Sequence, residues 1–211
     1  ESLCKHFQSK TLKGFGVDTL SQGIIASGAV MHYLAETQHH KLQHITAIER
    51  ILEDDYVWMD KFTIRNLELY NSYNANAVTL IDVIDHTISP MGGRLLKRWL
   101  ALPLKTIDKI KSRHEVVQYF LNHDDTHLKI QNYIKQVGDL ERLISKVATA
   151  KVNPREVIQL KNSLEAIVPI KSLSTQCENS DLRRIGDKFE SCEVLREKIK
   201  TTLREEAPVN I

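Results

Sequence analysis

The chain of 211 residues contains 42% hydrophobic and 27% charged residues, an ordinary globular balance that excludes a disordered chain and a membrane-spanning protein. Its formal net charge of +2 is too small to indicate nucleic-acid binding, which requires a concentrated basic patch. The three cysteines form no C-x-x-C pair, so they indicate reduced thiols in a cytoplasmic protein rather than a disulfide framework.

The N-terminal part of the chain predicts a turn followed by one helix. Gly14 and Gly16 mark the turn, and no phosphate-binding glycine loop occurs anywhere in the sequence. Apolar and small residues over 20–37 predict a largely buried helix. His40 and His44 have the spacing of two zinc ligands on a helix, but no third ligand is evident, so a solvated helix end is favoured.

Residues 44–50 and 56–59 are β-branched and aromatic runs that flank the acidic residues 53–55. Short runs of this kind, separated by a polar tip, are typical of two paired strands. The sequence therefore predicts a small β-hairpin near residues 45–59. A cation site at the acidic tip is an alternative, and a solvated tip is the favoured interpretation.

The clearest helix signals lie in residues 60–104, a stretch that we call the bracket. Asp60 is placed to cap a short helix over 61–69, and another short helix is predicted over 78–84. Asparagines between these two segments predict a polar loop.

A longer helix is predicted to begin at Ser89 and Pro90. The serine can cap a free backbone N–H, and proline at the first helical position loses no hydrogen bond. Leu102 precedes Pro103, which forces an extended backbone and ends the helix there. We expect the bracket to be a buried connection between helices.

One face of this helix is basic, with Arg94, Lys97 and Arg98 opposite its apolar residues. These cations could contact DNA phosphates, which would make the chain an autonomous helical module that binds nucleic acid or protein. A solvated face, or a face against a neighbouring domain, is favoured.

After Pro103 the pattern is helical. His123, Asp124 and His127 give the best indication of an enzyme, because neighbouring histidines and carboxylates suit a divalent ion. The corresponding hypothesis is a helical metal-dependent phosphohydrolase. The residues lie between two helix patterns, so a polar loop is favoured.

The remaining sequence predicts further helices. Gly138 and Asp139 look like a helix end followed by a cap, and Asn153 with Pro154 opens another helix. Residues 172–180 are polar and predict a loop, after which Gly186 or Ser191 is expected to separate two short helices.

Three strings in the chain resemble the MutS family of bacterial DNA mismatch-repair proteins: MDKFTIRNLEL from Met59, TISPMGGRLLKRWLALPL from Thr87 and VGDLERLISKVATAKVNPRE from Val137. The segment from Phe15 is similar to the end of that family's connector domain. The resemblance implies that residues 1–40 are the C-terminal part of the connector domain. Residues 41–211 would then be the first half of the helical core, or lever, domain, before the clamp insertion.

The implied fold is mainly α, an elongated helical lever with the small hairpin near residues 45–59. The implied role is a non-catalytic segment that transmits conformational change between the mismatch-binding end and the ATPase end of a longer protein. ATP and Mg²⁺, mismatched duplex DNA, a MutL-type partner and a second copy of the chain belong to that longer protein, which is expected in the bacterial cytoplasm. The chain opens on Glu1 rather than methionine, which also led us to expect a piece of something longer.

No catalytic, metal-binding or nucleotide-binding residue, and no cofactor, is expected in this piece. Structural or hinge roles are expected instead for a set of capping, corner and basic residues: Asp60, Arg65, Ser89, Pro90, Gly92, Arg94, Trp99, Pro103, Gly138, Asp139 and Arg142.

Overall fold

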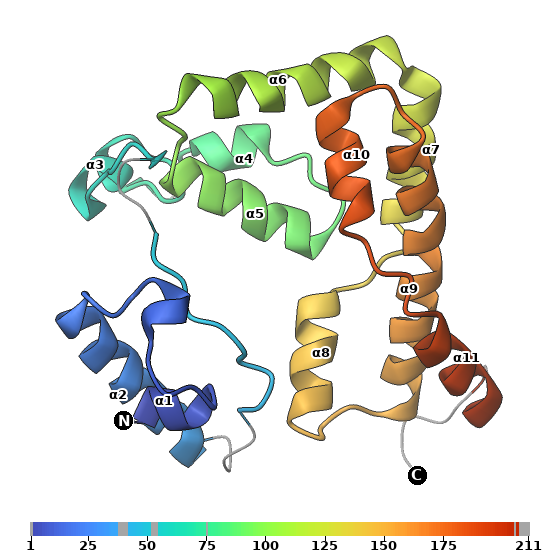
Figure 1. Ribbon diagram of the computed structural model, residues 1–211. Helices are drawn as coiled ribbons and strands as arrows, with labels where there is room; N and C mark the ends of the chain where they lie inside the picture. The colour runs from blue at the N-terminus through green and yellow to red at the C-terminus, as the bar shows by residue number, and fades with distance from the viewer. Residues whose placement is uncertain (1, 38–41, 52–54, 75, 205, 207–211) are drawn as a thin grey trace. The chain divides into compact units, whose positions relative to one another are not determined.

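The computed structural model of the chain is a set of helices joined by loops (Figure 1). It describes residues 2–37, 42–51, 55–74, 76–204 and 206. Within these ranges it contains eleven α-helices, one short 3-10 helix and no strand beyond an isolated bridge. The mainly α fold class predicted from the sequence is confirmed.

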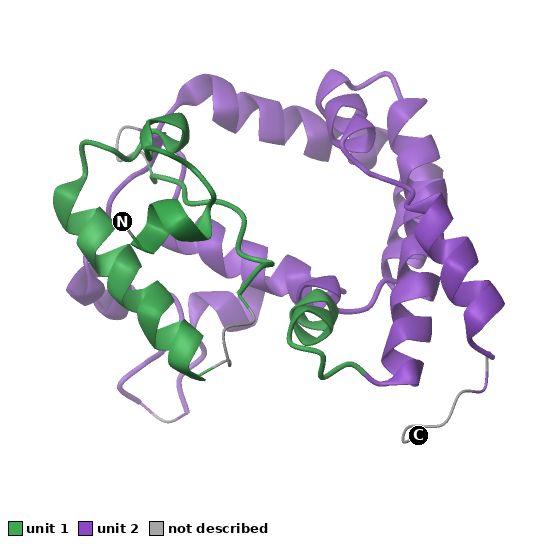
Figure 2. Cartoon of the chain, turned by 60° about the horizontal axis from the view of Figure 1, so that its bottom comes forward, with its two compact units in different colours: residues 1–52, 142–152 green, residues 53–141, 153–211 purple. Residues whose placement is uncertain are grey.

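The chain divides into two compact units, coloured separately in Figure 2. Unit 1 consists of residues 1–52 and 142–152, and unit 2 consists of residues 53–141 and 153–211. The backbone therefore crosses from one unit to the other after residues 52, 141 and 152.

Unit 1 is built on α1 (Ser2–His6), the 3-10 helix η1 (Lys13–Phe15) and α2 (Ser21–Thr37). Gly16 follows η1 with a φ of 67°, a left-handed backbone that glycine adopts without strain, so the predicted turn is present. The core of the unit consists of five buried side chains: Leu3, Leu12, Val17, Met31 and Leu42.

The prediction that α2 is largely buried is wrong. Met31 is its buried side chain, whereas Ile25, Val30 and Tyr33 are each more than half exposed. The apolar residues of α2 are distributed around the helix instead of along one face, so the rest of unit 1 covers only one side of it.

The predicted β-hairpin near residues 45–59 is also wrong. Residues 45–51 form no strand, and residues 52–54 lie outside the described part of the chain. Tyr56 forms an isolated antiparallel bridge with Leu104 instead. Its partner is far away in sequence. The proline at position 103 keeps the backbone around Leu104 extended, so that it can pair with Tyr56.

Two backbone hydrogen bonds flank this bridge. The Val57 N–H donates to the Pro103 carbonyl at 2.8 Å, and the Lys105 N–H donates to the Asp55 carbonyl at 3.0 Å. We call residues 55–57 and 103–105 the stem. It closes the chain segment that contains the bracket.

Unit 2 contains most of the helices. They are α3 (Lys61–Asn66), α4 (Leu80–Ile84), α5 (Pro90–Ala101), α6 (Ile107–Asn122), α7 (Asp124–Ile134), α9 (Pro154–Thr175), α10 (Ser180–Asp187) and α11 (Glu193–Thr202). The helix α8 (Leu140–Ala148) begins in unit 2 and continues into unit 1.

The core of unit 2 is organised around α9, which α7, α10 and α11 flank in Figure 1. Asn153 accepts the Glu156 N–H at 2.9 Å and Glu156 accepts the Asn153 N–H at 3.1 Å, so a capping box opens α9 where the sequence predicts its start. Apolar residues on α9 and its neighbours are buried together: Leu160, Leu164, Ala166 and Ile170 with Ile130, Leu182 and Ile199.

The predicted loop over residues 172–180 is wrong in its first half, because α9 continues to Thr175 with Pro169 inside it. The polar side chains there find partners within the helix: the Thr175 hydroxyl donates to the Lys171 carbonyl at 2.9 Å. The helix α10 covers this end of α9, and that packing outweighs the loop-forming tendency of the serines. The break between the last two helices spans residues 188–192, which include Ser191. Gly186 lies inside α10 and does not separate the helices.

Candidate functional site

The bracket is held by local caps, as its sequence predicts. The Asp60 carboxylate accepts the Thr63 N–H at 2.6 Å, and this hydrogen bond lowers the pKa of Asp60. The Ser89 hydroxyl accepts the Gly92 N–H at 3.1 Å, and Pro90 is the first residue of α5. Both helices therefore begin where their capping residues place them.

Gly92 lets α5 start close to the corner formed by residues 85–89. A Cβ at this position would lie 3.1 Å from the Ser89 hydroxyl oxygen and 3.4 Å from the Thr87 Cβ. That corner is fixed by Asp85, which accepts hydrogen bonds from the Thr87 N–H at 3.0 Å and from the Thr87 hydroxyl at 2.5 Å. The Thr87 hydroxyl is the main cause that lowers the pKa of Asp85.

Two arginines stack on aromatic rings at the two ends of the bracket. The Arg65 guanidinium lies 3.7 Å from the centre of the Tyr73 ring, and the Arg113 guanidinium lies 3.7 Å from the centre of the Trp99 ring. Cation–π contacts of this kind orient the rings as well as attracting them. Burial lowers the pKa of Arg113.

The Arg94 side chain joins α5 to the start of α8. Its Nη1 donates to Asp139 Oδ2 at 2.9 Å and its Nη2 to Asp139 Oδ1 at 2.7 Å, while its Nε donates to Glu141 Oε2 at 2.8 Å. The Asp139 hydrogen bonds, followed by those of Glu141, raise the pKa of Arg94. All three nitrogens of the guanidinium are engaged, a geometry that lysine cannot reproduce.

Gly138, next to Asp139, is tied to α9. Its N–H donates to the Ser163 hydroxyl at 3.0 Å, and this hydroxyl donates to the Gln159 carbonyl at 2.8 Å. Ser163 has no exposed surface. The residues that begin α8 are therefore held by α5 on one side and by α9 on the other.

Arg142, the last of the expected structural residues, is the first residue of α8 that belongs to unit 1. Within that unit it lines a hollow of about 350 Å³ together with side chains that include Leu34, Leu42 and Thr149. The structure thus places Asp139 and Arg142 on either side of the crossing between the two units.

The side chains of the phosphohydrolase hypothesis approach one another at one place, and the distance there is long. His127 Nδ1 lies 3.8 Å from Asp124 Oδ1, while the His123 ring stacks on Tyr119 with ring centres 4.1 Å apart. His123 Nδ1 is 2.8 Å from the Tyr119 carbonyl, which it reaches as a donor. The predicted polar loop is wrong here, because α7 already begins at Asp124.

No group of three or more His, Cys, Asp or Glu side chains in the described residues is arranged to hold a metal ion. His40, one of the two histidines considered for zinc, and the acidic residues 53 and 54 lie outside that part of the chain. No helix among the described residues is long and apolar enough to cross a membrane.

The basic face of α5 is largely matched by carboxylates of the chain itself. Arg94 binds Asp139 and Glu141, and the positive charge of Lys97 contributes to the lowered pKa of Asp82 and of Asp85. The Thr79 hydroxyl is the main cause of the lowered pKa of Asp82. Arg94, one of the three cations of this face, is therefore engaged by carboxylates of the chain itself.

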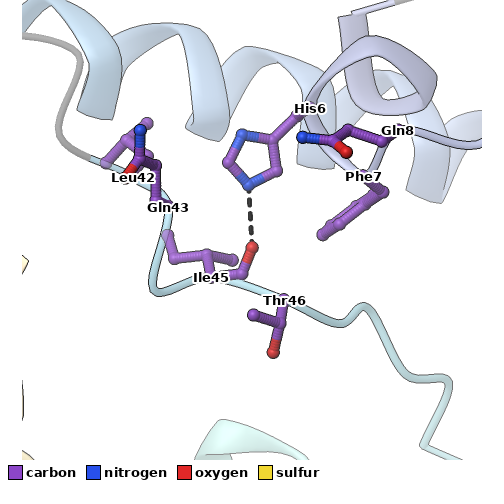
Figure 3. Close-up of a pocket in the computed structure, with 7 residues that line it drawn as sticks. All are labelled: His6, Phe7, Gln8, Leu42, Gln43, Ile45 and Thr46. Carbon is purple, nitrogen blue, oxygen red and sulfur yellow. Dashed lines mark hydrogen bonds between the residues drawn. The ribbon is translucent and has the colours of Figure 1, made fainter.

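A separate hollow of about 320 Å³ lies in unit 1 (Figure 3). His6 Nε2 lies 2.8 Å from the Ile45 carbonyl, so it carries the hydrogen and donates. The other lining residues are Phe7, Gln8, Leu42, Gln43, Ile45 and Thr46, which include no acid and no nucleophilic thiol. The arrangement joins α1 to residues 42–46.

The residues of these contacts that are absent from the sequence-based set include Arg113, Glu141 and Ser163. For Ser163 a signal exists, because it falls three residues after Leu160 and next to Leu164, on the apolar face of the predicted helix. Arg113 and Glu141 carry no comparable signal, because charged residues on predicted helices are usually solvated.

The described residues thus define a helical scaffold, fixed by caps, stacked rings and ion pairs. The chain belongs to the MutS family, since the family model for MutS domain III matches residues 62–211. It is 64% identical to the DNA mismatch repair protein MutS of Flavobacterium psychrophilum and 63% identical to that of Flavobacterium johnsoniae, each over 211 residues. The protein of the same name from Bacteroides thetaiotaomicron is 50% identical over the same length. These matches cover 100% of the chain but only 24% of each relative, so the chain spans about a quarter of the length of these curated relatives.

Proposed function

We propose that the chain is a connector and lever segment of a MutS-type mismatch-repair protein, and that it transmits conformational change between an end that holds mismatched DNA and an end that hydrolyses ATP. Residues 1–40 would be the C-terminal part of the connector domain, and residues 41–211 the first half of the core domain. The observation that carries this proposal is the match of residues 62–211 to MutS domain III.

The helices of unit 2 are suited to this task. A helix rises 1.5 Å per residue, so the 22 residues of α9 extend about 33 Å. Flanking helices bury one side of α9 over most of that length. Helices packed in this way move as rigid bodies, so a displacement at one end reaches the other end with little loss.

The whole protein would supply the chemistry and the partners. We assign ATP with Mg²⁺, mismatched duplex DNA, a MutL-type partner and homodimerisation to that protein, which we place in the bacterial cytoplasm. The names of the relatives, DNA mismatch repair protein MutS, support this assignment. The chain by itself would be non-catalytic.

The first experiment uses the 211-residue chain alone. We expect no ATP hydrolysis above background and no shift of a mismatched duplex in a gel. Clear ATP turnover would contradict the proposal. Salt-dependent DNA binding would point instead to an autonomous binding module, because release of counterions from DNA makes such binding weaker as salt rises.

The second experiment tests transmission in the whole protein. Asn162 is exposed in the middle of α9, where proline kinks a helix, glycine softens it and alanine leaves it straight. The readout is the ratio of ATP turnover rates with mismatched and matched duplexes. We expect Asn162→Ala to keep the wild-type ratio, Asn162→Gly to reduce it and Asn162→Pro to bring it close to one, with mismatch affinity retained. A folded Asn162→Pro protein with an unchanged ratio would contradict transmission through α9.

A further inference from the structure

We propose that Arg94 is a releasable electrostatic latch on the joint where the chain enters α8. This inference rests on the proposed function, and it names a point in the lever where movement is controlled. We define the joint as residues 138–141, which are the last residues of unit 2 before the first return to unit 1.

The chain path makes this joint important. Residues 142–152 belong to unit 1, whereas the residues on either side of this segment belong to unit 2. Any displacement that passes between the units along this segment must therefore pass through residues 138–141 or through the start of α9 at Asn153.

The two ends of the segment are held differently. At Asn153 the capping box and Pro154 fix the chain to the first turn of α9 with short-range hydrogen bonds. At the joint, contacts with two other helices contribute, through the buried Ser163 hydroxyl of α9 and the Arg94 guanidinium of α5.

The Arg94 contact is open to release. The Arg94 side chain is 47% exposed and Glu141 is 69% exposed, so salt and water can compete for both groups. Asp139 is 22% exposed and accepts the two Nη groups in parallel, which gives the contact a defined geometry. Ser163, in contrast, has no exposed surface, so its bond to Gly138 acts as a fixed pivot.

The amides of α8 report on this latch. The N–H groups of residues 144–148 donate within α8, and their hydrogen exchange requires that the helix opens locally. If Arg94 holds the joint, removing its charge raises the open population of α8 without unfolding unit 2.

The experiment is hydrogen exchange of these amides in the 211-residue chain, at low salt and in 1 M NaCl. We expect Arg94→Gln to exchange about fivefold faster than wild type at low salt, the effect of a well-formed but partly exposed ion pair. Wild type should approach that rate in 1 M NaCl, whereas Arg94→Gln should change little with salt. Arg94→Lys should lie between wild type and Arg94→Gln, because lysine keeps the charge but loses the parallel pair of hydrogen bonds.

Arg98→Gln on the same helix is the control, and it should exchange like wild type. Equal exchange in wild type and Arg94→Gln at low salt would overturn the proposal, and so would an equal acceleration by Arg98→Gln. A uniform acceleration over all of unit 2 in Arg94→Gln would also overturn it, because that pattern indicates global destabilisation.

This experiment involves neither ATP nor DNA, so its outcome is separate from that of the proposed function. A latch seen by exchange together with an unchanged turnover ratio in Asn162→Pro would leave the latch in place and remove the transmission role. Unchanged exchange in Arg94→Gln, together with a reduced turnover ratio in Asn162→Pro, would remove the latch and leave the transmission role in place.

Discussion

Gly186 of α10 lies so close to Ser174 of α9 that a Cβ at position 186 would sit 2.9 Å from the Ser174 Cβ. The same Cβ would lie 2.9 Å from the Thr175 Cγ2 and 3.1 Å from the Thr175 backbone nitrogen. A glycine is therefore required for these two helices to approach as they do. The contact fixes α10 against the C-terminal half of α9.

Gly186→Ala is expected to lower the free energy of unfolding by about 1–3 kcal/mol, because an added methyl group in a packed interface forces the helices apart. Chemical denaturation followed by circular dichroism measures this change. Gly28→Ala in α2 is the control: among the described residues, nothing beyond its own helix backbone and its chain neighbours lies within 4 Å of the added Cβ, so it should be neutral or stabilise by up to about 1 kcal/mol. A Gly186→Ala protein as stable as wild type would show that the interface adapts freely.

Ser163→Ala is expected to cost about 1–3 kcal/mol of unfolding free energy, since the Gly138 N–H loses a buried acceptor. Ser172→Ala makes a matched control on the same helix, where the serine is exposed and the change should stay within about 0.5 kcal/mol. Urea denaturation of both variants measures the change in unfolding free energy. Equal stability of the two would mean that water or another group replaces the lost hydroxyl.

Stability should fall in acid because of carboxylates such as Asp82, which accepts the Thr79 N–H at 3.0 Å and the Thr79 hydroxyl at 2.6 Å. These hydrogen bonds lower the pKa of Asp82 below its ordinary value of 3.8, so at low pH the unfolded chain binds a proton more readily than the folded chain. The stabilisation is complete well above pH 3.8 and is lost as the pH falls through the lower, folded pKa.

Two variants isolate this effect. Asp82→Asn removes the titrating group and Thr79→Val removes the hydroxyl donor, so each should be less stable than wild type at pH 6 and lose less stability between pH 6 and pH 3. The denaturation midpoint at several pH values measures both quantities. If the denaturation midpoint falls equally steeply with decreasing pH in wild type and in both variants, Asp82 is excluded as a source of the acid sensitivity.

Arg113→Gln is expected to lower stability by about 0.5–1 kcal/mol and to change the fluorescence of Trp99, because it removes the cation above the ring. The chain has a second tryptophan, Trp58, so the spectra should be recorded in a Trp58→Phe background. Lys111→Gln on the same helix serves as the control and should leave the emission unchanged. Identical emission of Trp99 with arginine and with glutamine at position 113 would argue that the stacking is not maintained in solution.

The parts of the fold that the sequence predicts well are those with local causes. Asp60, Ser89 and Asn153 each accept an N–H three residues later, as the capping pattern requires. The information for such a cap lies within four residues, so no knowledge of the tertiary structure is needed.

Two of the failures share a cause, which is a partner outside the local segment. The run around Tyr56 has strand character, but its partner is Leu104 and not the run at 45–50. The serines after residue 171 favour a loop, yet packing against α10 keeps them in α9. Local preference is weak compared with burial of this kind.

The contacts of the candidate site also divide into those with a local cause and those with a distant partner. Arg94 and Asp139 were both expected to be structural, but nothing in the sequence pairs two residues 45 positions apart, and their bidentate contact becomes evident only in the structure. Ser163 was missed because serine has a polar side chain and its burial depends on the neighbours of α9.

The stem has a consequence for how the chain could fold and vary. Because backbone hydrogen bonds join residues 55–57 to 103–105, the bracket is a closed loop whose two ends meet. The entropy of closing a loop depends only weakly on its length, so extra residues inserted between α3 and α4 would leave the stem and the helices beyond it nearly undisturbed. The length and path of the chain inside the bracket can thus change while the distance between the two halves of the stem stays constant.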